Sequence, residues 1–279
     1  MMKSIRVGMG QILIEAGQPQ ANLKRAVEMI AKAADAGCDL IVLPECLDIG
    51  WTDTRARALA QPIPGPHVEI LAQAARDYQI HVAAGLVERA DSKLYNAAVL
   101  LDSEGQICLL HRKINELDIA ADLYAIGDRL GVAHTKLGAI GLDICADNVP
   151  NSLAIGHVLA RMGAQIIVAP SAWAVPPDHD QTQDPYGALW RESYQQLSRL
   201  YDLPVVGMSG VGWLEEGAWK GWKVIGCSLA VNADATVAAQ APYGVDAENL
   251  TIVELTLRQP TVLGTALTDE LRSRGYDGI

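Results

Sequence analysis

Short apolar runs alternate with amphipathic segments along almost the whole chain. In the runs, apolar side chains follow one another over four to ten positions, which is typical of strands. In the amphipathic segments, apolar residues recur at three- and four-residue spacing, as Leu23, Ala26, Val27, Ile30 and Ala34 do, which indicates helices with one buried face. The expected strands are residues 5–14, 39–43, 80–87, 96–101, 107–111, 132–137, 139–144, 165–169, 204–209, 224–231, 236–239 and 250–257. The expected helices are residues 22–36, 66–78, 152–162 and 186–201.

Turn signals join several of these strands into hairpins. Residues 102–105, Gly138 and residues 232–235 each stand between two expected strands. Hairpins beside strand–helix–strand units predict an α/β fold with mixed sheets rather than a purely parallel one. No linker-like composition interrupts the pattern. We therefore expect one domain over residues 1–257 and a polar tail over residues 258–279, lying outside the core and available to pack on a partner subunit.

Composition narrows the class of protein. The chain has 279 residues, half of them apolar, which is enough for a sizeable core. Its formal net charge of −11 argues against nucleic acid or an anionic membrane as a partner. No apolar stretch is long enough to span a bilayer, and the first residues run straight into a strand pattern without a signal peptide. We expect a cytoplasmic protein.

The five cysteines are scattered and never form a C-x-x-C pair, which favours free thiols in a reducing compartment and no structural zinc. Cys38, Cys46, Cys108 and Cys227 are expected to be buried structural residues. We expect no metal and no organic cofactor, since no metal-binding or nucleotide-binding motif is present and residues 178–180 are typical of a solvated loop.

Three reactive residues each follow an apolar, strand-like run: Glu45 after residues 39–44, Lys113 after residues 107–112, and Cys145 after residues 139–144. An acid, a cation and a thiol at three strand ends suggest one shared site for acyl transfer. Cys145 is expected on an exposed turn, where the following backbone N–H groups would lower its pKa and bind an oxyanion. His111 is kept as an alternative candidate for the general base.

Taken singly, each of the three is ordinary: a buried cysteine, a surface acid, a basic strand end. Together, Leu43-Pro44-Glu45, Arg112-Lys113 and Ile144-Cys145-Ala146-Asp147 resemble the nitrilase superfamily, the carbon–nitrogen hydrolases. Asn96-Ala97, Gly127-Asp128, residues 169–173 and Gly226-Cys227-Ser228 extend the resemblance over residues 4–257.

The resemblance implies a four-layer α-β-β-α sandwich. It implies that Glu45 is the general base, Lys113 the oxyanion stabiliser and Cys145 the nucleophile, with no cofactor. It also implies a homodimer, or a higher homo-oligomer, that packs through the helices expected at residues 152–162 and 186–201.

One departure concerns a second glutamate that many members carry about eight positions before the Gly-Asp pair. That position here is Ala120, and Glu116, Asp118 and Asp122 are the nearby acids. We keep Glu116 as a candidate substrate-binding residue. The apparent loss of this glutamate leaves a second interpretation open, in which the chain is a catalytically weak relative that serves as a binding or interaction protein.

The substrate is expected to be a small-molecule amide or ureido (N-carbamoyl) compound. Ala146-Asp147 follows the nucleophile where true nitrilases usually have Trp-Glu, which favours amides over the alternative of a nitrile. The Ala146 N–H would help to bind the oxyanion, and Trp51 and Trp173 would line the pocket. The tryptophan-rich loop 213–222 is either a lid or an oligomer contact.

Overall fold

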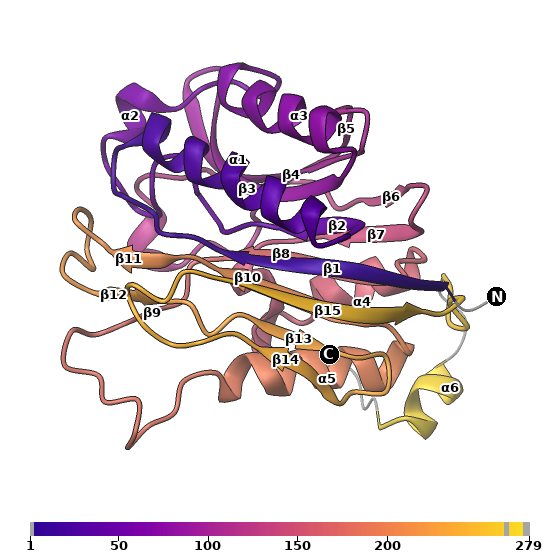
Figure 1. Cartoon of the computed structure of the whole chain (residues 1–279). Helices are drawn as coiled ribbons and strands as arrows, with labels where there is room; N and C mark the ends of the chain where they lie inside the picture. The colour runs from indigo at the N-terminus through magenta and orange to yellow at the C-terminus, as the bar shows by residue number, and fades with distance from the viewer. Residues whose placement is uncertain (1–2, 265–267, 276–279) are drawn as a thin grey trace.

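The structure is a computed structural model that describes residues 3–264 and 268–275. In these residues the strands form two six-stranded sheets and one three-stranded sheet. The two large sheets pack against each other, and helices cover their outer faces (Figure 1). The expected four-layer α-β-β-α sandwich with mixed sheets is confirmed.

The first sheet has the order β15-β1-β2-β3-β4-β5. β1, β2 and β3 are parallel neighbours, while β15, β4 and β5 join as antiparallel strands. The hairpin predicted around residues 102–105 is present between β4 and β5. The bounds are β1 Lys3–Gln11, β2 Leu40–Val42, β3 His81–Ala90, β4 Lys93–Leu101, β5 Ile107–Arg112 and β15 Asn249–Leu257.

The second sheet has the order β14-β13-β10-β8-β7-β6. Its centre, β7, β8 and β10, is parallel, and hairpins add β6 on one side and β13 with β14 on the other. The bounds are β6 Val132–His134, β7 Ala139–Leu142, β8 Ile166–Ser171, β10 Val205–Ser209, β13 Leu229–Val231 and β14 Val237–Gln240.

The expected single strand over residues 224–231 is wrong. Lys223–Ile225 is β12, in the small sheet with β11 (Val211–Trp213) and β9 (Ala174–Val175), whereas β13 lies in the second large sheet. The chain turns between them at Gly226 and Cys227, which have φ angles of +65° and +58°. A Cβ on Gly226 would lie 2.2 Å from Nε2 of Gln11, so this crossing requires glycine.

Helices cover the outer face of each large sheet (Figure 1). α1 (Pro19–Asp35) and α3 (Pro66–Tyr78) pack on the first sheet, and α4 (Ala154–Arg161) and α5 (Ala188–Tyr201) on the second. α1 begins earlier than expected because Pro19 is well suited to the first turn of a helix. Two short helices, α2 (Ala56–Leu59) and α6 (Thr268–Ser273), were not expected from the sequence.

The segment after β15 does not lie wholly outside the core. Val262 is 2% exposed and belongs to the apolar cluster formed by the second sheet, its helices and the inner face of the first sheet. Farther on, Arg274 forms an ion pair of 2.6 Å with Asp202, at the end of α5. Within the described ranges, no helix is both long and apolar enough to cross a membrane.

Candidate active site

Glu45 lies just beyond β2, where the backbone passes very close to β3. Gly85 N donates to Pro44 O at 2.9 Å, and a Cβ on Gly85 would lie 2.5 Å from Glu45 Cα. Glu45 N in turn donates to Ser171 O at the end of β8, at 3.2 Å, so that both large sheets hold this residue. The Glu45 side chain is completely buried.

Lys113 reaches the same place from the end of β5. Its backbone N–H donates to Asn96 O on β4 at 2.8 Å, and its Nζ lies 2.6 Å from Oε1 of Glu45. Asn96 Nδ2 also donates to this oxygen at 2.6 Å. The other oxygen of Glu45, Oε2, is buried and accepts no hydrogen bond from the described residues. A carboxylate with one free oxygen is able to accept a proton.

The Lys113 ammonium is charged although its side chain is fully buried. Burial disfavours the charge, but Glu45 and then Glu116 outweigh it and hold the pKa of Lys113 well above its ordinary value. The ammonium also lies 5.6 Å from the ring centroid of Trp51.

Cys145 starts a 3-10 turn, Cys145–Asn148, with a φ of +44°, and it is 7% exposed. The expectation of an exposed thiol with a lowered pKa is therefore wrong. Burial raises the pKa of Cys145 far above its ordinary value, and Glu45 raises it further, while Lys113 and a hydrogen bond from the Ala172 backbone lower it. The thiol is neutral in the free protein, so it could act as a nucleophile only if a base took its proton.

Asp147 fixes the Cys145 turn against the segment that carries Lys113. Its Oδ1 accepts the backbone N–H groups of Ile114 and Asn115, at 3.2 and 2.8 Å. Its Oδ2 lies 2.8 Å from His111 Nε2 and also accepts the N–H of Ile144 at 3.1 Å. His111 is thus held by Asp147 and joins the two segments.

Glu116 lies beside Lys113. Its side chain is 3% exposed, and its Oε2 is 3.9 Å from Lys113 Nζ. Ala120, the position expected from the family spacing, is buried in a short 3-10 turn, and Asp118 and Asp122 are exposed. Of the acids considered from the sequence, Glu116 is therefore the one whose carboxylate is near the lysine. Burial raises the pKa of Glu116 to about 7.

We expect Glu116→Gln to change how stability depends on pH. The pKa of Glu116 rises on folding from its ordinary value of 4.5 to about 7, so the folded state binds more protons between these values. The free energy of unfolding therefore falls as pH rises through this range, by about 3 kcal/mol from this group. Urea unfolding from pH 4.5 to 8 should show the variant gaining that amount over the wild type.

The control for this measurement is Asp118→Asn, which changes an exposed acid two positions away. Its unfolding free energy should follow the wild-type curve. A Glu116→Gln curve parallel to the wild type would mean that Glu116 does not titrate in this range.

A cavity of about 210 Å³ opens beside Cys145 and Ala146. Trp51 and Trp173, both named from the sequence, line it. Trp219 of the β11–β12 loop lines it too, so this loop covers the site within one chain. Sequence reasoning missed Tyr186 and Trp190, which also line the cavity. Tyr186 precedes α5 and Trp190 lies in its first turn, and their spacing of four was the available signal.

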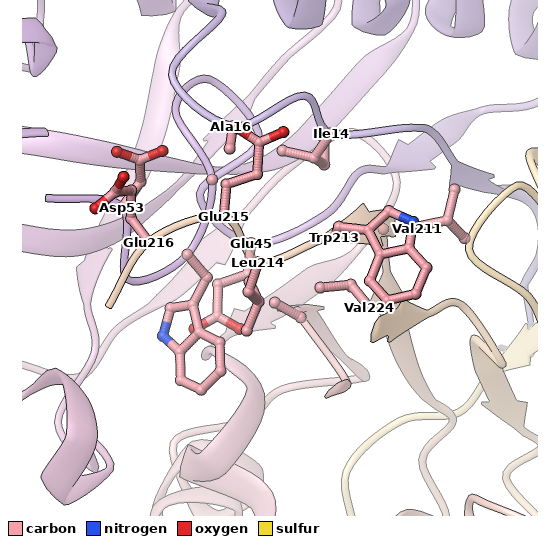
Figure 2. Close-up of a pocket in the computed structure, with 14 residues that line it drawn as sticks. Ile14, Ala16, Glu45, Asp53, Val211, Trp213, Leu214, Glu215, Glu216 and Val224 are labelled. Carbon is pink, nitrogen blue, oxygen red and sulfur yellow. The ribbon is translucent and has the colours of Figure 1, made fainter. Parts of the chain in front are cut away.

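A second, much smaller pocket lies beside Glu45, with a volume of about 20 Å³, enough for about one water molecule. Figure 2 shows Asp53 and Glu216 on one side of this pocket, and Trp213 with Val224 on the other. Trp51 and Ala172 line both pockets and so lie between them.

All five cysteines are free thiols. Cys38, Cys46 and Cys227 are buried as expected, but Cys108 on β5 is exposed, which corrects its assignment as a buried structural residue. Over residues 3–264 and 268–275, no group of three or more side chains is arranged to hold a metal ion.

A sequence profile of the family described as carbon-nitrogen hydrolase matches residues 6–261. Omega-amidase NIT2-A of Xenopus laevis is 32% identical over 162 residues, 54% of this chain and 58% of that protein. The omega-amidase NIT2 of Xenopus tropicalis is 30% identical over 182 residues, which are 62% of this chain and 65% of that protein. The chain thus matches less than two thirds of the length of these relatives.

The fold is shared with solved structures. A carbon-nitrogen hydrolase from Helicobacter pylori G27 superimposes with a TM-score of 0.80 at 22% identity, over 90% of this chain and 89% of that one.

Proposed function

Because this chain belongs to the carbon-nitrogen hydrolase family, we propose that it hydrolyses a non-peptide C–N bond of a small-molecule amide through a thioester on Cys145. The family resemblance of the motifs is thereby confirmed. The observation that carries the proposal is the meeting of the buried Glu45–Lys113 pair with the Cys145 thiol, at the wall of a cavity of about 210 Å³.

In the first half-reaction, Glu45 takes the thiol proton while sulfur attacks the amide carbon. Lys113 Nζ and the Ala146 N–H stabilise the oxyanion of the tetrahedral intermediate. The C–N bond then breaks, the nitrogen leaves with the proton from Glu45, and a thioester remains on Cys145. In the second half-reaction, Glu45 takes a proton from water and the hydroxide attacks the thioester carbon. The C–S bond then breaks, the proton returns from Glu45 to the sulfur of Cys145, and the carboxylic acid leaves.

Glu116 acts in this proposal as a positioning residue. With Glu45 it places a second carboxylate beside Lys113, at 3.9 Å, and both raise the pKa of the lysine. A fully buried ammonium beside Glu45 and the ionised form of Glu116 keeps its charge and its direction. It is then ready for the oxyanion that appears only during the reaction.

We also propose that the protein is a cytoplasmic homodimer or higher homo-oligomer that packs through α4 and α5. Val158 and Met162, at the outer side of α4, are 43% and 46% exposed although they are large and apolar. The five free thiols fit a reducing compartment. Packing of the segment after residue 257 on a partner subunit remains a prediction.

The test is incubation with acetamide, butyramide, an N-carbamoyl amino acid and a nitrile, followed by ammonia release and intact mass. The protein should carry Cys108→Ser, because the exposed Cys108 would otherwise collect unrelated adducts. We expect ammonia from an amide and a transient acyl adduct on Cys145, both absent in Cys145→Ala. Binding without ammonia release would indicate a binding protein instead, and reaction of the nitrile alone would indicate a nitrilase.

A further inference from the structure

The cavity beside Cys145 is bounded by two sets of aromatic rings. Trp51 and Trp219 meet edge to face, with ring centroids 5.5 Å apart. Trp173 stacks on Trp190 at 5.0 Å with an interplanar angle of 17°. These rings come from four separate segments: the loop after β2, the β8–β9 connection, α5 and the β11–β12 loop. Such walls favour a flat or bulky apolar group between them.

The cavity offers no counter-ion for a charged substrate. None of the described residues that line it is an acid, a lysine, an arginine or a histidine. The ammonium of Lys113, in the neighbouring catalytic group, is already paired with Glu45 at 2.6 Å. Acids line the neighbouring pocket, and the net charge of the chain is −11. A carboxylate carried by the acyl group would therefore lose its hydration without gaining a partner.

The volume of the cavity limits the size of the acyl substituent that it can hold. An apolar cavity of about 150 Å³ accepts a benzene molecule, and the volume here is about 210 Å³. Resting on the function proposed above, we propose that the substrate is an amide whose acyl group is uncharged and bears an aryl or branched-alkyl substituent. Acyl groups that end in a carboxylate are selected against.

The first experiment compares kcat/KM for four primary amides by the ammonia they release: phenylacetamide, butyramide, acetamide and succinamate. Butyramide and succinamate form a matched pair, because a terminal methyl group in the first is a carboxylate in the second. We expect phenylacetamide to exceed acetamide by about tenfold. Butyramide should exceed succinamate by about a hundredfold. Succinamate equal to or faster than butyramide would overturn the inference.

The second experiment places a cation at the cavity. Leu117 lines it and is 36% exposed, so an arginine there can remain hydrated. Leu117→Arg should raise the succinamate-to-butyramide ratio of kcat/KM by about tenfold. Leu117→Gln, which is polar but neutral, should not. Ile70→Arg, on α3 in the other helical layer, controls for added charge. An unchanged ratio in Leu117→Arg would show that the acyl group binds elsewhere.

Measuring how tightly amides bind, apart from their turnover, tests the proposed specificity independently of the proposed function. The tryptophans around the cavity allow ligand binding to Cys145→Ala to be followed by fluorescence. If no amide is turned over but phenylacetamide binds tighter than succinamate, the function fails and the specificity stands. If amides are turned over with a preference for the carboxylate, the function stands and the specificity fails.

Discussion

Replacing Glu45 with glutamine is expected to slow amide turnover by about three orders of magnitude. Glutamine keeps the size of the side chain, and its oxygen can still accept from Lys113 Nζ and Asn96 Nδ2, which lie 2.6 Å from Oε1 in the wild type. It cannot take a proton. Because the pKa of Cys145 is far above neutrality, its thiol would remain protonated and acylation would slow. Thioester hydrolysis would slow as well, because the attacking water also needs a base.

Single-turnover kinetics with an activated ester separate the two half-reactions. Glu28→Gln, on the exposed side of α1, is the matched control and should react like the wild type. Wild-type rates of both acylation and deacylation in Glu45→Gln would exclude Glu45 as the base. His111, bound to Asp147 at 2.8 Å, would then be the next base to test.

The second large effect is expected for Lys113→Met, which should lower turnover by about a hundredfold or more because no ammonium meets the oxyanion. It should also lower the free energy of unfolding by about 3–5 kcal/mol, since Glu45 is left as an unpaired buried charge. Chemical denaturation and steady-state kinetics on the same preparation measure both effects.

The double variant Glu45→Gln/Lys113→Met separates the two roles of the lysine. Removing both charges should restore most of the lost stability, because neither buried side chain then lacks a counter-ion. Turnover should stay lost. A single Lys113→Met variant with wild-type turnover, or a double variant that regains activity, would restrict Lys113 to a structural role.

Local pattern predicted the strands and the residues at their ends well, because alternation and apolar runs depend on neighbours in sequence. Thus α3 begins and ends where the sequence predicts, and β2, β5 and β7 each precede a proposed catalytic residue. One place where local reasoning failed is the Gly226–Cys227 turn, where left-handed backbone divides one apolar run between two sheets.

Burial and charge could not be predicted in the same way, because they depend on segments far apart in the chain. Cys145 is covered by residues near 172 and 190, which no local pattern connects to it. Of the acids considered for the second glutamate, Glu116 is the one beside Lys113, although counting by family spacing pointed to Ala120, which a 3-10 turn places in the core. The exposure of Cys108 similarly depends on how β5 forms the edge of its sheet.

The order of the first sheet has a consequence for how the protein is made. β1, near the beginning of the chain, lies between β2 and β15, and all nine residues of β1 pair with β15. During synthesis on a ribosome, one edge of β1 therefore stays unpaired until residues 249–257 have emerged. A nascent chain can therefore complete this sheet, and show the hydrolytic activity proposed above, only after residue 257 has emerged.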